Sequence, residues 1–282
     1  MKKDNLVSTV LTEARNRRSM LKTLGIAASV AGAVGASSEK LEAQSSLTVV
    51  DVLQFALNLE YLEAEFYTVA TTGQTIDQVG IGIDGSGKPG PTTGGNQVNF
   101  ANNLVFTGQV AAEIGTDERA HVKLLRQALS AAGVTPVAKP AINLGALGVG
   151  FGNVVEFLTL ARVFEDIGVT AYAGAAGLPF VGNSPYIGTA ARILAAEAEH
   201  VGNIRLQVAR LNISTTALDG ADILPPPSGQ KFISVDATTG LSAVRTPGQV
   251  LYLAYGFQAN ATSGGFFPNG VNGVINMSSS AA

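Results

Sequence analysis

Two short stretches, Glu118-Arg-Ala-His121 and Glu197-Ala-Glu-His200, contain both histidines of this 282-residue chain. Residues three positions apart share one face of an α-helix, so each stretch predicts a carboxylate and an imidazole directed at one point. Two such Glu-x-x-His pairs, with one inward-facing Glu from each of two further helices, form the ligand set of a carboxylate-bridged dinuclear metal site in a four-helix bundle. The sequence therefore predicts an all-α bundle built around a pair of metal ions.

An internal repeat indicates which glutamates complete the set. Glu60 is followed by Tyr67, and Glu165 by Tyr172, in each case seven residues later. Seven residues are nearly two helical turns, so each Tyr lies on the face of its Glu. Each Glu-x6-Tyr segment precedes a Glu-x-x-His segment, which predicts two copies of one helical hairpin related by a pseudo-two-fold axis. The predicted metal ligands are Glu60, Glu118, His121, Glu165, Glu197 and His200, with Glu118 and Glu197 bridging and the other two glutamates terminal.

Several polar neighbours of these ligands have predicted supporting roles. Tyr67 and Tyr172 would either donate a hydrogen bond to a ligand carboxylate or simply pack their rings. Asp117 would accept a ring N–H from the opposite histidine, and because the second repeat has Ala196 there, the two metal positions would differ. Glu63 lies about 60° around the helix from Glu60, at the edge of the site. Solvent-facing positions are expected for Glu65, Glu156 and Glu199.

The charge of the predicted site favours metal ions. Four glutamates in a bundle core would carry about −4, which a low-dielectric interior does not hold unpaired, whereas two divalent cations neutralise it. Carboxylates mixed with one imidazole per metal suit Fe or Mn better than Ca, and Zn usually occupies four-coordinate sites. We therefore expect two Fe ions, or alternatively two Mn ions. The alternative reading of a Glu-x-x-His pair is an ordinary pair on a helix surface.

The composition excludes several classes of function. A net charge of −3 with 14% charged residues gives no basic patch for nucleic acid. The chain has no cysteine, so iron–sulfur clusters, thiolate zinc sites, disulfides and a cysteine nucleophile are all excluded.

Capping and breaker signals divide the chain. The predicted bundle spans 44–212, with helices over 48–70, 105–132, from 154 to about 174, and 184–211. The first helix begins at Thr48, and the last at Ser184 followed by Pro185. A Gly-rich surface loop over 73–98 and a crossover over 134–152 connect them. The extension over 213–282 is predicted to hold a short strand at 231–235 and a short helix at 250–255.

The amino terminus is predicted to be an export signal. Arg17 and Arg18 precede an apolar run over 24–36 that is too short to remain as a membrane span. The pair is followed by Ser, Met, Leu and Lys, which is typical of a twin-arginine signal over 1–43. The alternative is a general secretory signal, or a basic amphipathic start, that happens to contain two arginines. The twin-arginine signal predicts an exported, periplasmic or extracytoplasmic protein with no stable membrane anchor after cleavage.

Five segments carry a resemblance to a known family: Ala56-Leu-Asn-Leu-Glu-Tyr-Leu-Glu-Ala-Glu-Phe-Tyr67, Asp117-Glu-Arg-Ala-His121, Phe164-Glu-Asp-Ile-Gly-Val-Thr-Ala-Tyr172, Ile193-Leu-Ala-Ala-Glu-Ala-Glu-His200 and Phe266-Phe-Pro-Asn-Gly-Val-Asn-Gly273. Over about 47–275 the chain resembles the ferritin-like superfamily, and more narrowly the ferritin-like domain family that includes plant desiccation-related proteins and exported bacterial homologues. The resemblance implies di-iron or di-manganese chemistry of the ferroxidase, peroxidase, catalase or oxygenase kind. The long first loop and the C-terminal extension depart from cage ferritins, so a storage shell is not expected.

The leading expectation is an exported dinuclear metal protein that reacts with O2 or H2O2 in stress protection. A second is a non-catalytic desiccation-related or metal-sequestering protein whose metal only stabilises the bundle. A third is a binding module that uses the Gly-rich loop and the aromatic tail on a cell-envelope partner. The adjacent Phe266 and Phe267 also suggest a homodimer.

Overall fold

The computed structural model describes residues 47–100 and 105–282. The expected export signal lies outside the described residues. Four long helices form the bundle: α3 (Val49–Thr72), α4 (Val105–Ala131), α5 (Val154–Ala176) and α7 (Ile187–Arg210). This confirms the predicted all-α architecture. Within the described ranges, no helix combines the length and apolarity that a membrane crossing requires.

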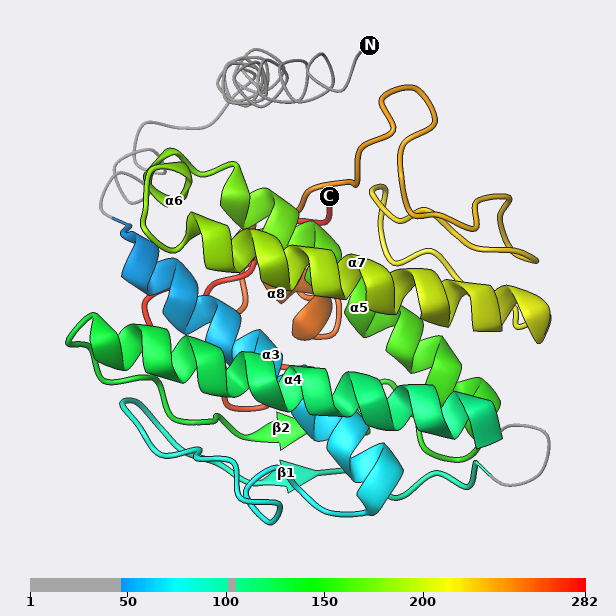
Figure 1. Cartoon of the computed structure of the whole chain (residues 1–282), viewed down its shortest axis with the longest axis horizontal. Coiled ribbons are helices and arrows are strands. Elements are labelled where there is room, and N and C mark those ends of the chain that lie inside the picture. The colour runs from blue at the N-terminus through cyan, green and yellow to red at the C-terminus, as the bar shows by residue number, and fades with distance from the viewer. Residues whose placement is uncertain (1–46, 101–104) are drawn as a thin grey trace, which may run out of the picture. The chain divides into compact units, whose positions relative to one another are not determined.

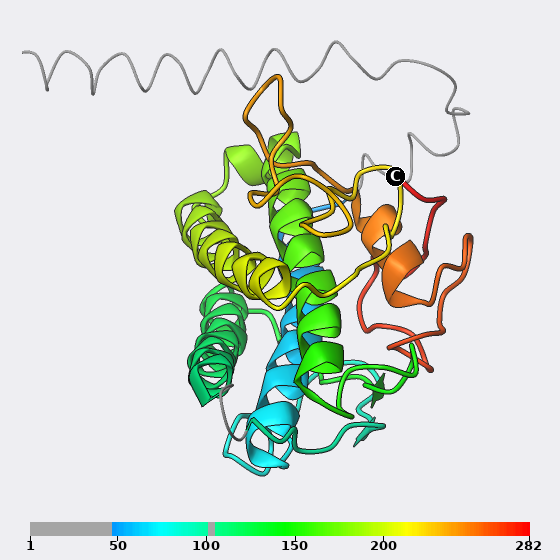
Figure 2. The ribbon, with the colours of Figure 1, turned by 90° about the vertical axis from the view of Figure 1, so that its right-hand side faces the viewer.

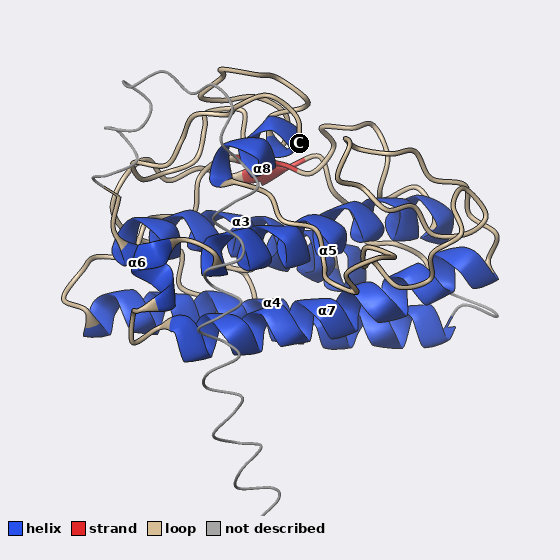
Figure 3. Cartoon of the chain, turned by 90° about the horizontal axis from the view of Figure 1, so that it is seen from above, coloured by secondary structure: helices blue, strands red, loops and turns tan. Residues whose placement is uncertain are grey.

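The helices form two layers (Figures 1 and 2). α3 packs along α4 and α5 packs along α7, whereas α4 and α7 make few contacts with each other. Figure 3 shows α4 and α7 in one layer, α3 and α5 in the next, and the loops with α8 (Pro247–Ala254) above them. The α3–α5 layer is therefore covered on both sides, and its helices are the most deeply buried.

Local capping chemistry sets most helix ends where the sequence predicts them. The hydroxyl of Thr48 accepts from the backbone N–H of Asp51, and the Asp51 carboxylate accepts in return from the Thr48 N–H. Gly73 ends α3 in the left-handed region at φ 74°, where a residue without a Cβ is favoured. Asn153 caps α5 through the Glu156 N–H.

The start of the fourth bundle helix differs from the prediction. α7 begins at Ile187, after a short helix α6 (Pro179–Gly182), and Pro185 lies outside it. The Ser184 N–H donates to the Val181 carbonyl at 2.9 Å. Ser184 therefore closes the turn after α6 and caps no helix.

The Gly-rich loop and the crossover pair through a small sheet. β1 (Thr92–Thr93) runs parallel to β2 (Ile142–Asn143). Glu65 faces this sheet and is fully buried, which corrects the expectation that it is solvated. The Lys139 ammonium lies 3.2 Å from its carboxylate, and Thr92 donates a hydrogen bond to it at 2.7 Å. Its position around the helix correctly placed Glu65 off the face that holds the metal site. That other face is covered by the loop and crossover segments of the β1–β2 sheet and is not exposed to water.

The C-terminal extension contains the predicted short helix but not the predicted strand. α8 begins with the capping box of Thr246 and Gln249. Residues 231–235 form bends, because the Arg205 guanidinium takes the carbonyls of Lys231 and Phe232 that a strand would offer to a neighbour. The strand prediction was therefore wrong.

The aromatic tail packs on the chain's own bundle. Phe266 and Phe267 are both buried, and the Phe266 ring lies 5.0 Å from that of Phe164 in α5. The two rings therefore present no apolar surface to a second subunit, and the homodimer stays a prediction without this support.

Candidate metal centre

Six side chains from all four long helices converge in the centre of the bundle. Their ligand atoms form two groups of four, and within each group the atoms all lie within 4.8 Å of one another. The first group is Glu60, Glu118, His121 and Glu197, and the second is Glu118, Glu165, Glu197 and His200. Glu118 and Glu197 belong to both groups, which is the arrangement expected of two carboxylates that bridge a pair of ions.

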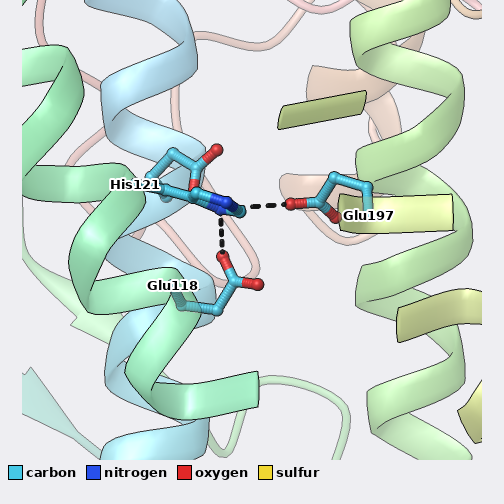
Figure 4. Close-up of side chains that lie close together, drawn as sticks. Glu118, His121 and Glu197 are labelled. Atoms are coloured by element: carbon cyan, nitrogen blue, oxygen red, sulfur yellow. Dashed lines mark hydrogen bonds and ion pairs between the residues drawn. The ribbon is translucent and has the colours of Figure 1, made fainter. Parts of the chain in front are cut away.

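The first group is arranged around one nitrogen of His121. Its Nδ1 lies 3.3 Å from Glu60 Oε2, 3.3 Å from Glu118 Oε2 and 3.6 Å from Glu197 Oε1. Figure 4 shows Glu118 and His121 side by side on α4, with Glu197 reaching toward them from α7. The i, i+3 spacing thus brings the carboxylate and the imidazole together, and the neighbouring helices add the other oxygens.

The second group repeats the first with one difference. His200 Nδ1 lies 3.1 Å from Glu118 Oε1 and 3.3 Å from Glu165 Oε2. Its other ring nitrogen, Nε2, lies 3.3 Å from Asp117 Oδ2. Asp117 is 50% exposed and thus connects His200 to the surface. Ala196 occupies the corresponding position on α7, so the two halves of the centre are not equivalent.

The two tyrosines cross between the repeats. Tyr67 of α3 donates a hydrogen bond of 2.5 Å to Glu165 of α5, and Tyr172 of α5 donates to Glu60 of α3. Each hydroxyl therefore orients the terminal glutamate of the other hairpin. Burial, followed by the adjacent carboxylate, raises the pKa of both tyrosines well above the usual value, so both remain proton donors.

The buried oxygens that face the centre lack hydrogen-bond partners among the described residues. They include Glu60 Oε2, Glu118 Oε1, Glu165 Oε2 and both carboxylate oxygens of Glu197. Nδ1 of His200 is also unpartnered. Buried polar atoms are normally satisfied, and these six unpartnered atoms all belong to residues of the two ligand groups. Carboxylate oxygens with one imidazole nitrogen in each group fit a pair of divalent transition ions.

Proton affinities in the metal-free protein show how strongly the centre requires positive charge. Burial opposes charging of the histidines, but Glu60 and Glu118 raise the pKa of His121 to about 11. Glu118 and Glu165 raise that of His200 to about 12. Protons thus occupy nitrogens that metal ions would otherwise bind.

The carboxylates of the centre differ among themselves in proton affinity. Burial, together with Glu60 and Glu165, raises the pKa of Glu118 to about 7, although the two neighbouring histidines act to lower it. Burial and the other glutamates raise the pKa of Glu197 well above its usual range. Burial would also raise that of Glu60, but His121 holds it below the ordinary value. The two shared carboxylates therefore bind protons more tightly than Glu60 does in the metal-free protein.

Glu63 lies beside the centre and belongs to neither group. Its carboxylate is buried, and burial followed by the charge of Glu197 raises its pKa well above the usual range. Gly168 of α5 leaves space for the carboxylates of Glu63 and Glu197. A Cβ at this position would lie 2.5 Å from Glu197 Oε2 and 3.2 Å from Glu63 Oε1. Sequence reasoning placed Glu63 at the edge but missed Gly168. Its only signal was a glycine inside a helix, which costs stability unless packing requires it.

Comparisons with known proteins identify related sequences. Ferritin-like catalase Nec2 of Nesocodon mauritianus is 24% identical over 274 residues, which cover 80% of this chain and 84% of that protein. Desiccation-related protein PCC13-62 of Craterostigma plantagineum is 29% identical over 143 residues, which cover 45% of this chain and 42% of that protein. No solved structure matches the chain significantly.

Residues 48–210 match the Ferritin-like domain family. The match includes the four bundle helices and all six converging side chains. Because it covers more than half of the chain, the protein belongs to the Ferritin-like domain family.

Proposed function

We propose that the protein is an exported dinuclear Fe or Mn protein that reacts with H2O2 or O2. The observation that carries this proposal is the pair of four-ligand groups that share Glu118 and Glu197. Glu60 and His121 would complete the first metal position, and Glu165 and His200 the second. When bound, the two ions would supply two-electron redox chemistry without releasing a free radical.

The chain's own residues prepare the centre for that chemistry. The six side chains are held on rigid helices, and Tyr67 and Tyr172 fix the rotamers of the terminal glutamates. Burial keeps bulk water away from the ions and strengthens every electrostatic interaction there. Asp117 would accept a hydrogen bond from Nε2–H of His200, which would leave Nδ1 to face a metal.

Peroxide is the favoured reactant. The relative that aligns over four fifths of this chain is named a catalase. Catalase-type turnover needs no external electron donor, because one peroxide is oxidised while another is reduced. That balance suits a chain without cysteines that could relay electrons.

A matched pair of substitutions on α7 tests the centre. Glu197→Gln removes one shared carboxylate, whereas Glu199→Gln makes the same change at an exposed position two residues away. We expect protein from the extracytoplasmic fraction to contain about two Fe or Mn per chain, as two such ligand groups require. Glu197→Gln should lower metal content to one or fewer and peroxide consumption by at least about 100-fold, which is about 2.7 kcal/mol of lost stabilisation. Glu199→Gln should match the wild type.

A second candidate function is supported by the relative named for desiccation. In that case the metal only stabilises the bundle. The protein would then contain tight metal and lose thermal stability on chelation, with no peroxide consumption in the wild type. Equal peroxide turnover by Glu197→Gln and the wild type would instead refute the centre as the catalyst.

A further inference from the structure

A small cavity lies between α3, α5 and α8, on the side of the bundle away from α4 and α7. Its volume is about 30 Å³, and its walls are apolar except at one point. Leu59, Val163 and Ala254 each come from a different one of the three helices. Among the described residues that line the cavity, Glu63 is the one with a titratable side chain.

The inner end of the cavity lies beside the metal centre, at Glu63 and Gly168. Gly168 lines the cavity, and its missing side chain leaves the space into which Glu197 Oε2 and Glu63 Oε1 both extend. Glu197 Oε2 is buried and has no hydrogen-bond partner among the described residues. Glu197 is not in the cavity lining, so a molecule in the cavity would contact Glu63, whose carboxylate lies beside the carboxylate that both ligand groups share.

The outer end of the cavity is formed by the C-terminal extension. Phe266 is buried, whereas Phe257, which also lines the cavity, is 42% exposed. Figure 3 shows α8 and the loops of the extension lying over the α3–α5 layer. The extension thus forms the outer wall of the cavity, and this wall is exposed to solvent at Phe257.

The size and polarity of the cavity select its occupant. A water molecule needs about 10–15 Å³ measured in this way, so the cavity holds about two heavy atoms. Apolar walls would strip a charged ion of its hydration, which is costly. A small neutral molecule with one hydrogen-bonding end fits both the walls and Glu63.

We propose that this cavity is the docking site through which a small neutral oxygen molecule, H2O2 or O2, reaches the metal centre, with Glu63 as a binding residue. This inference rests on the proposed function of the same centre. It also gives the C-terminal extension a role, because the extension builds the outer half of the site.

A second cavity provides the internal comparison. It has a volume of about 40 Å³ and lies among α3, α5 and the start of α7, with Tyr172 and Arg245 in its lining. The Tyr172 hydroxyl is already committed to Glu60. No unpartnered carboxylate lines this cavity within the described part of the chain. It therefore lacks a carboxylate like that of Glu63 in the first cavity.

The first experiment uses the metal-free full chain and needs no turnover. Dissolved O2 relaxes the NMR signals of methyl groups that it contacts, so Val163 should respond more strongly than Leu129, which is buried away from both cavities. Ala254→Leu fills the proposed site from α8 and should abolish the Val163 response while leaving that of Leu53 in the second cavity. Ala190→Leu, which fills the second cavity, should do the opposite. Ala254→Val provides a smaller substitution if the leucine variant does not fold.

The second experiment measures peroxide kinetics in the metal-loaded chain. Ala254→Leu fills the cavity and Glu63→Leu removes its hydrogen-bonding group, so each should raise KM for H2O2 by about fivefold or more, with a smaller change in kcat. Glu63→Gln keeps a hydrogen-bonding group and should restore KM to within about twofold of the wild type. Ala190→Leu should leave KM unchanged.

Different outcomes separate this inference from the proposed function. If the wild type binds metal but consumes no peroxide, the proposed function fails, and the oxygen experiment alone decides whether the cavity is a docking site. If Val163 responds no more than Leu129, the docking site is refuted whatever the activity. A rise in KM caused by Ala190→Leu and not by Ala254→Leu would also overturn it.

Discussion

At the scale of single residues, Gly168 decides whether the shared carboxylate fits. The shortest predicted contact of an added Cβ is with Glu197 Oε2, the far end of a flexible side chain. The helix could therefore accept the methyl group if the carboxylate moved. The glycine therefore preserves the position of a metal ligand and not the stability of the fold.

This argument predicts separate effects of one methyl group on metal binding and on folding. Gly168→Ala should weaken metal binding by about 10- to 100-fold, as loss of a ligand's support typically does. The Tm of the metal-free protein should change little. The control is Gly202→Ala on α7, where nothing lies within 4 Å of the added atom. That variant should keep its metal and gain about 0.5–1 kcal/mol of stability. Metal analysis and thermal unfolding of both variants would test the prediction, and unchanged metal affinity in Gly168→Ala would contradict it.

At the scale of elements, α3 and α5 are connected at the centre by two crossed hydrogen bonds. Each runs from the tyrosine of one hairpin to the terminal glutamate of the other. The crossing follows from the pseudo-two-fold axis, because a tyrosine two turns beyond its own glutamate reaches the glutamate of the antiparallel neighbour. The same bonds orient the ligands and align the helices.

Removing one hydroxyl should therefore cost both stability and ligand order. Tyr67→Phe leaves a buried oxygen of Glu165 without its donor, and we expect a loss of about 1–3 kcal/mol in the free energy of unfolding. Tyr252→Phe is the control, since its hydroxyl makes no hydrogen bond within the described residues and its ring contact with Phe257 is retained. Chemical denaturation of the two variants measures the difference. Equal losses would show that the bond to Glu165 contributes nothing.

At the scale of the whole molecule, the centre makes stability depend on pH. His121 and His200 have folded pKa values of about 11 and about 12, against an ordinary value of 6.5. Glu118 has about 7 against 4.5, and the pKa of Glu197 is raised as well. A group whose pKa is raised by folding contributes stability that is present below the unfolded pKa and is lost as pH rises through the folded pKa. Glu60, whose pKa is lowered, acts in the opposite sense.

The metal-free protein should therefore become less stable as pH rises. The loss begins near pH 4.5 through the carboxyls and continues above pH 6.5 through the histidines. Each titrating group contributes about 1.4 kcal/mol per pH unit, and each kcal/mol is worth about 2–4 °C in a domain of this size. Thermal unfolding of protein freed of metal by a chelator, measured at pH 5, 7 and 9, should show a Tm that falls by several degrees per pH unit.

Added metal should reverse this trend. Ligands bind metal only after losing their protons, so stabilisation by Mn²⁺ or Fe²⁺ should grow with pH. A Tm of chelated protein that rises between pH 5 and pH 9 would contradict the proton-binding centre. A Tm that falls equally with and without metal would show that the ions bind elsewhere.

The sequence by itself determined the helices and the face on which each chemical group lies. The spacing within Glu118–His121 and Glu197–His200, and from Glu60 to Tyr67, is a local property of an α-helix. Caps such as Thr48 are equally local. These features are encoded within a few residues, so they can be read without knowing what packs against them.

Only the tertiary structure decided how the faces combine. The crossing of Tyr67 to Glu165, the gap that Gly168 leaves for Glu197 and the burial of Glu65 against Lys139 all depend on residues distant in the chain. The expected strand at 231–235 was lost because Arg205, on another element, takes its carbonyls. A periodic pattern fixes the direction of a side chain relative to its own helix, whereas its partners, its solvent exposure and the cavity beside it depend on where the other segments of the chain fold.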